Sequence, residues 1–197
     1  NKTRFIKKEN KKEIFNIIEN KKIESFKNIY LSGDNNYIFT FDEDKGLVKV
    51  YDVLNKKYIK EMNVFGNKLI VSFDGKYMTT ESEGVIYLWD VTQGILYKKI
   101  SFGTEKISSV IFTPNDEYLL IVDYENQKIG VWDIKAEKVV AKYRPPINRI
   151  GDISLTMYFS DDGRYLLGLG CDPEIQIIDT RNWKKIVDSS TFSQIGF

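Results

Sequence analysis

Short apolar segments recur along the sequence at a nearly constant interval, separated by polar stretches. In four of them, β-branched or aromatic residues alternate with other residues, and the segment ends in aspartate. This period of two is typical of a β-strand. The segments are 47–52, 85–90, 128–133 and 174–179. Their final aspartates are 38, 43 and 46 residues apart, which predicts a structural repeat.

Further strands are predicted on both sides of each of these segments. A polar stretch and a second strand follow it, at 57–62, 95–100, 138–143 and 184–187. Upstream lie an apolar strand, a polar turn and a strand that starts with tyrosine, with the turns at 32–37, 73–77, 113–118 and 160–165. Asp, Asn, Gly and Pro gather in these turns, as tight hairpins require. Each repeat therefore predicts four strands joined by hairpins.

The repeats resemble those of the WD-repeat (tryptophan-aspartate repeat) family. The resemblance rests on the Trp-Asp pairs at 89–90 and 132–133, on turns such as 160–165, and on the length of the repeat. The family's Gly-His dipeptide is missing, and Tyr51 and Ile178 stand in place of the tryptophan in the first and fourth repeats. The chain therefore resembles a degenerate member. The resemblance implies an all-β fold, a β-propeller of four-stranded antiparallel blades, with the two tryptophans packed between adjacent blades.

About five blades are predicted when both ends of the sequence are counted. Residues 1–26 look like the later strands of an earlier blade, and 192–197 look like its first strand. A ring closed by joining these two segments hides exposed sheet edges. Part of a larger seven-bladed propeller is the alternative, and both stay open. The predicted blades of this single domain, 1–197, are 1–26 plus 192–197, 27–63, 66–101, 105–143 and 150–190.

Composition narrows the range of functions. The 197 residues are 42% apolar and 29% charged, which fits a globular protein, and a net charge of +1 does not favour nucleic acid as partner. The absence of histidine excludes Ser-His-Asp and Cys-His nucleophile pairs and His-ligated metals. Cys171 is the only cysteine, and apolar runs such as 118–122 are strand-sized, so we expect no disulfide and no membrane insertion. Because the sequence starts with Asn1 rather than Met, we expect it to have been cut out of a longer chain or to have been processed.

We expect no enzyme activity and no cofactor or metal site. Propeller ligands usually bind where the inner strands start, and a propeller glycosidase needs a pair of carboxylates there. Among those positions only Asp152 carries one. The aspartates that recur once per blade are predicted to bond the backbone of turns instead. They are Asp52, Asp90, Asp133 and Asp179.

The strongest candidate for partner binding is the loop 143–149, the longest connection between blades. Tyr143, Arg144 and Arg149 are residue types favoured at binding hot spots, and two prolines stiffen the loop. A merely long linker is the alternative interpretation. The other predicted partner-binding residues are Asp152, Lys106, Asn67 and Trp183. Trp183 lies in a predicted turn, where we expect it to be partly exposed.

The family resemblance implies a scaffold that binds other proteins through the loops of a propeller face. Two alternatives stay open. One is a small-ligand or carbohydrate-active propeller that uses residues of the central channel, and the other is an RNA-associated propeller.

Overall fold

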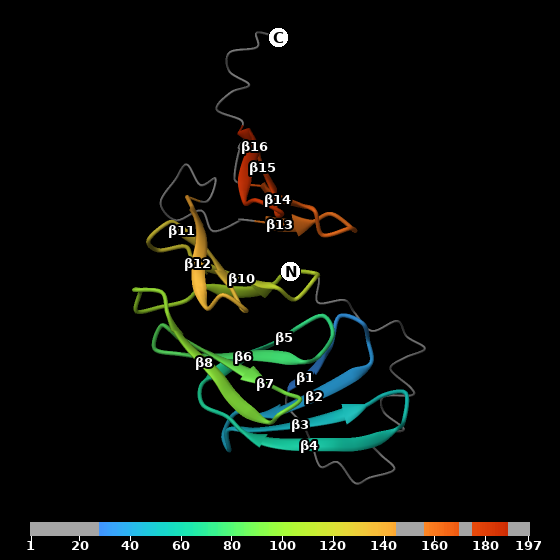
Figure 1. Cartoon of the computed structure of the whole chain (residues 1–197). Coiled ribbons are helices and arrows are strands. Elements are labelled where there is room, and N and C mark those ends of the chain that lie inside the picture. The colour runs from blue at the N-terminus through green and yellow to red at the C-terminus, as the bar shows by residue number, and fades with distance from the viewer. Residues whose placement is uncertain (1–27, 145–155, 170–174, 189–197) are drawn as a thin grey trace. The chain divides into compact units, whose positions relative to one another are not determined.

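The computed structural model describes residues 28–144, 156–169 and 175–188, and every element in these ranges is a β-strand (Figure 1). The all-β prediction is confirmed. No helix that is long and apolar enough to cross a membrane occurs in the described ranges. The chain divides into two compact units, Asn1–Ser101 and Phe102–Phe197, which are described separately below.

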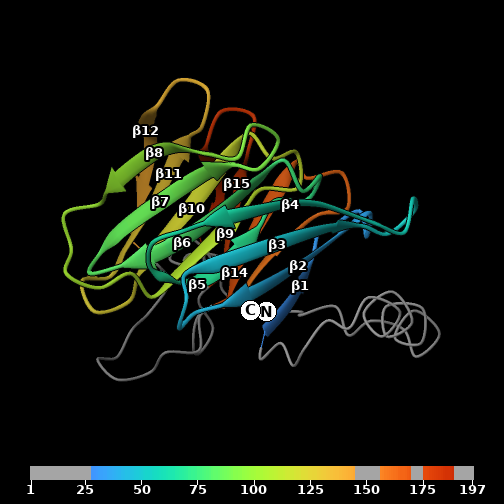
Figure 2. The ribbon, with the colours of Figure 1, turned by 90° about the horizontal axis from the view of Figure 1, so that it is seen from below.

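The first unit contains two four-stranded antiparallel sheets whose strands follow chain order. Figure 2 shows β1 to β4 side by side. The strands of this sheet are β1 (Asn28–Leu31), β2 (Tyr37–Asp42), β3 (Leu47–Asp52) and β4 (Lys57–Asn63). Those of the next sheet are β5 (Asn67–Val71), β6 (Tyr77–Ser82), β7 (Val85–Asp90) and β8 (Ile95–Ser101).

The second unit repeats this pattern with two further four-stranded antiparallel sheets. The strands of one are β9 (Ser109–Phe112), β10 (Tyr118–Asp123), β11 (Lys128–Asp133) and β12 (Lys138–Tyr143). Those of the other are β13 (Thr156–Phe159), β14 (Tyr165–Leu169), β15 (Ile175–Asp179) and β16 (Lys184–Asp188).

The predicted four-strand repeat is confirmed in all four sheets. The third strands β3, β7 and β11 occupy the predicted segments, and every second strand starts at its predicted tyrosine. This arrangement is consistent with a propeller-like fold. The segments 1–26 and 192–197, on which ring closure depends, lie outside the described residues, so the number of blades stays a prediction.

Each unit has a hydrophobic core between its two sheets. In the first unit, Phe39, Val50 and Met62 of one sheet form a buried cluster with Met78 and Trp89 of the other. This confirms the predicted packing of Trp89 between neighbouring sheets. Full burial of each such side chain contributes about 1.5–3 kcal/mol to folding. The corresponding cluster of the second unit contains Leu120, Val131, Leu166, Ile178 and Trp183.

The recurring aspartates close the hairpins between the third and fourth strands. Each accepts a hydrogen bond from a backbone N–H two or three residues further on, which confirms their predicted structural role. The bonds are Asn55 N to Asp52 Oδ1 (2.8 Å), Gln93 N to Asp90 Oδ1 (2.9 Å), Ala136 N to Asp133 Oδ1 (2.7 Å) and Arg181 N to Asp179 Oδ1 (3.0 Å).

A side-chain hydrogen-bond chain links β6, β7 and the connection that precedes β5. Trp89 Nε1 donates to Thr80 Oγ1 at 3.0 Å, and Thr80 Oγ1 donates to the backbone oxygen of Phe65. The sheets β1–β4 and β9–β12 retain only one member of it, and the sheet β13–β16 has Gly168 and Ile178 at the two positions. Where Tyr51 replaces the tryptophan, Thr40 Oγ1 has no partner in the described ranges, and where Ile121 replaces the threonine, Trp132 Nε1 has none.

Every fourth, outer strand contains a β-bulge at the same place. The register shifts opposite Val50/Tyr51, Leu88/Trp89, Val131/Trp132 and Ile177/Ile178. The extra residue lies seven positions after the aspartate that ends the third strand. We call these four residues the bulge residues: Ile59, Tyr97, Val140 and Ile186. A bulge bends the strand and redirects its side chain, and these side chains are exposed by 41%, 36%, 39% and 56% respectively.

Candidate functional site

The candidate site lies along β12 and its last neighbour, where the predicted partner-binding loop begins. Lys138, Val140, Lys142 and Arg144 are all exposed, and we call them the β12 surface. None of its three cations has an ion-pair partner in the part of the chain that the structure describes. β12 is an edge strand of its sheet, so the edge of the sheet carries this surface.

Tyr143 anchors the end of this surface to the second sheet of the unit. Its side chain is half-buried, and its hydroxyl donates a hydrogen bond to the backbone oxygen of Trp183. Burial raises the pKa of Tyr143 to about 12, so the hydroxyl keeps its proton at neutral pH and remains a donor. Tyr143 therefore fixes the backbone immediately before Arg144.

The predicted exposure of Trp183 is wrong. Its side chain is only 9% exposed and belongs to the core of the second unit. The indole ring meets the Tyr118 ring edge-on, with 5.1 Å between the centroids and 77° between the planes. The backbone φ of Trp183 is +55°, a conformation that bulky residues rarely adopt, and the corresponding position of the second sheet is Gly94. Trp183 lies in the core, and its backbone oxygen accepts the hydrogen bond from the Tyr143 hydroxyl.

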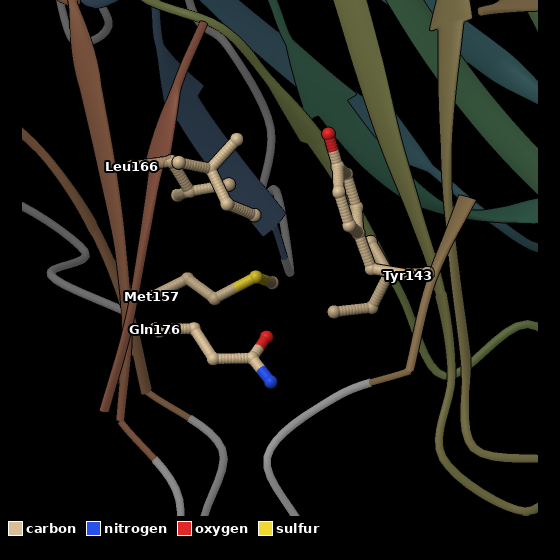
Figure 3. Close-up of a pocket in the computed structure, with 7 residues that line it drawn as sticks. Tyr143, Met157, Leu166 and Gln176 are labelled. Carbon is tan, nitrogen blue, oxygen red and sulfur yellow. The ribbon is translucent and has the colours of Figure 1, made fainter. Parts of the chain in front are cut away.

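A small cavity lies beside the Tyr143 side chain. Figure 3 shows Tyr143 on one side of it and Leu166, Met157 and Gln176 on the other. The cavity has a volume of about 10 Å³, at the lower limit for a single water molecule. It is a gap in the packing between two sheets, too small for an organic ligand.

The remaining predicted residues are Lys106, Asn67, Arg149 and Asp152. Lys106 is exposed, and its Nζ lies 3.0 Å from Glu125 Oε1, so its charge is already paired. Asn67 is exposed at the start of β5 and belongs to the first unit, whereas Lys106, Tyr143, Arg144 and Trp183 belong to the second. Two further predicted residues, Arg149 and Asp152, lie outside the described residues.

Lys138, Val140 and Lys142 were not among the residues predicted for the candidate site. Their signal is present in the predicted strand 138–143, where two lysines flank a valine at alternate positions. We interpreted 138–143 as an ordinary strand, because alternation alone does not reveal which strand lies at the edge of a sheet. The bulge that redirects Val140 depends on pairing with β11, so it is visible only in the structure.

The carboxylates of the described residues serve mainly as acceptors within turns. Hydrogen bonds from the Arg181 guanidinium hold the pKa of Asp179 at about 2, and hydrogen bonds from Ser160 and from the Arg164 backbone lower the pKa of Asp162. In the described ranges, no group of three or more Asp, Glu or Cys residues could hold a metal ion. The β12 surface thus exposes three cations and one apolar side chain, while many of the described carboxylates accept hydrogen bonds in turns.

Comparison with known protein-family models finds no match, and no curated protein matches the sequence. The resemblance to WD repeats therefore rests on the residues and sheets described above and stays a prediction.

Proposed function

We propose that this chain is a WD-repeat-type propeller that works as a protein-interaction module and binds a partner through the β12 surface. The observation that carries the proposal is the exposure of Lys138, Lys142 and Arg144 without a carboxylate partner in the described ranges. Elsewhere the chain pairs charges over short distances, as in Lys76–Asp74 (2.7 Å) and Lys106–Glu125 (3.0 Å). Uncompensated cations around an exposed apolar residue favour binding of an acidic surface.

The small-ligand alternative receives less support. The cavity beside Tyr143 has a volume of about 10 Å³, so this cavity does not itself hold a small ligand. The turn aspartates are engaged by backbone N–H groups, as at Asp90 and Asp133. These observations favour a binding surface over a catalytic channel.

The experiment compares two double variants of equal charge. Lys138→Ala with Lys142→Ala removes two cations of the β12 surface. Lys56→Ala with Lys128→Ala removes two exposed lysines that lie outside the fourth strands and serves as the matched control. Partners recovered with the wild type are identified by mass spectrometry, and the affinity of each variant for them is measured.

We expect the β12 double variant to bind the partner about 5- to 30-fold more weakly, because each lost ion pair contributes about 0.5–1 kcal/mol. Both double variants should keep the wild-type melting temperature within a few degrees. Equal binding by the β12 variant and the wild type would remove this surface from consideration.

A further inference from the structure

The sheet β13–β16 has a second apolar face, opposite the face that packs on β9–β12. Figure 3 shows Met157 and Leu166 pointing toward Tyr143 of β12, and all three belong to the core of the second unit. Alternate residues of a strand point to opposite faces of its sheet, so their strand neighbours lie on the other face, which we call the back face. Its residues are a row of cross-strand neighbours and one residue beside that row: Tyr158, Leu167, Ile177, Val187 and Ile175.

The equivalent row of β9–β12 is covered by another sheet. Its members are Ile111, Leu120, Val131 and Ala141. They all pack in the core of the second unit, and the two central ones are fully buried. On the back face the central residues Leu167 and Ile177 are only half-buried, and Tyr158 and Ile175 are exposed by 47% and 38%. An apolar row that is covered in one sheet is therefore partly open in the next, and such surfaces mark interaction sites.

Two exposed charges lie at the same end of these strands, at opposite edges of the sheet. Asp161 belongs to the turn between β13 and β14, and Lys184 begins β16. They lie at the same end because Tyr165, which begins β14, pairs with Asp179, and Asp179 pairs with Lys184. Neither charge has an ion-pair partner in the ranges that the structure describes. The row of four apolar residues carries no charge.

We propose that the back face binds a second copy of this chain, about a two-fold axis that runs parallel to the strands. Such an axis lays β13 of one copy over β16 of the other, so the row runs in opposite directions in the two copies. The large Tyr158 then faces the small Val187, and Leu167 faces Ile177. Large side chains opposite small ones let two sheets pack closely, and the uncharged row is buried without an unpaired charge.

The same axis also pairs the charges at the rim of the back face. Because the two edges of the sheet are exchanged, Asp161 of each copy lies next to Lys184 of the other, which gives two pairs of opposite charge. An axis across the strands instead separates these charges to opposite ends of the contact. Four short strands make a contact at the small end of specific interfaces, so we expect a dissociation constant of about 10–100 μM. The β12 surface belongs to the other sheet of the unit, so this inference is independent of the proposed function.

The first test measures sedimentation velocity of the full chain between about 1 and 300 μM. Lys184→Glu and Asp161→Lys each convert both rim pairs into pairs of like charge. We expect either variant alone to dimerise about 3- to 20-fold more weakly than the wild type. An equimolar mixture of the two should recover the wild-type affinity, because both contacts of the mixed dimer again join opposite charges. Lys135→Glu changes an exposed lysine in the β11–β12 turn and is the matched control.

The second test addresses the apolar row. Tyr158→Ser removes its most exposed side chain from both copies and should weaken dimerisation about 10-fold. Because that side chain is exposed in a single copy, the melting temperature of the monomer at low concentration should stay within a few degrees of the wild-type value. Leu54→Ser is the matched control, because Leu54 is 74% exposed in the β3–β4 turn and lies outside the back face.

Four outcomes would overturn the inference. One is a chain that stays monomeric over the whole concentration range. Another is a dimer that Tyr158→Ser leaves unchanged, and a third is no recovery of affinity in the mixture of the two charge variants. The fourth is binding of the monomer to phosphatidylcholine vesicles that Tyr158→Ser abolishes, which would assign the back face to lipid. The variant that combines Lys138→Ala and Lys142→Ala should dimerise as the wild type does, so a loss of partner binding there leaves this inference standing.

Discussion

Thr80 illustrates how one hydroxyl can connect three parts of a sheet. It accepts from the Trp89 indole and donates to the backbone of Phe65, so both of those groups are satisfied in a buried place. Its neighbour Thr79 is equally buried, but its Oγ1 has no partner in the described ranges. Two adjacent buried hydroxyl groups therefore differ: that of Thr80 has two hydrogen-bond partners, and that of Thr79 has none in the described ranges.

Valine substitutions at these two positions are expected to have different effects on the free energy of unfolding. Thr80→Val leaves the Trp89 N–H and the Phe65 carbonyl without partners and should lower the free energy of unfolding by about 1–3 kcal/mol. Thr79→Val removes a buried hydroxyl that has no described partner and should be neutral or stabilising. Denaturant midpoints measure both. A Thr80→Val protein as stable as the wild type would contradict the structural role assigned to the hydroxyl.

At the scale of the element, the aspartate-closed hairpins make the sheets sensitive to acid. Hydrogen bonds from the Arg181 guanidinium are the main reason that the pKa of Asp179 falls from 3.8 to about 2. A carboxyl group whose pKa is lower in the folded state stabilises the fold above its unfolded pKa. That stabilisation is lost as the pH falls through the folded value. For Asp179 the loss falls between about pH 4 and pH 2.

Arg181→Ala is expected to reduce the loss of stability over this pH window, because the carboxyl then titrates closer to its unfolded value. Melting temperatures between pH 5 and pH 2 test this. Arg144→Ala removes an exposed arginine that makes no bond to Asp179 and is the control. If both variants follow the wild-type curve, the bidentate contact does not contribute.

The limits of sequence-based prediction also become visible at this scale. The strands could be predicted because apolar residues at alternate positions indicate a strand with one buried face. A tyrosine after a polar turn marks the start of each second strand. The bulges could not, since the extra residue Val140 is defined by its pairing with β11 and not by its own neighbours. Trp183 was misjudged for a related reason: its packing against Tyr118 depends on a contact from another sheet. Its left-handed backbone is local, since Lys56, Gly94 and Glu137 have positive φ at the same turn position.

For the whole molecule, a net charge of +1 conceals a clear separation of charge. Lysines gather on the outer strands, while acceptors such as Asp34, Asp52, Asp90 and Asp162 lie in the turns, where they bind backbone N–H groups. These acidic residues therefore stabilise the turns. The lysines of the fourth strands differ in their surroundings, since Lys60 Nζ donates to the Thr92 backbone oxygen and Lys99 lies over the Tyr87 ring.

The presence of a core cluster in each unit predicts that the two units open independently. Met78 belongs to the cluster shared by the sheets of the first unit, and Leu166 to that of the second. Met78→Ala and Leu166→Ala should each cost about 2–5 kcal/mol through the cavity that they leave. Local opening then follows the weakened core, so Met78→Ala should speed amide hydrogen exchange mainly in β1 to β8, and Leu166→Ala mainly in β9 to β16. Equal acceleration in all sixteen strands by either variant would show that the described sheets unfold as one cooperative body.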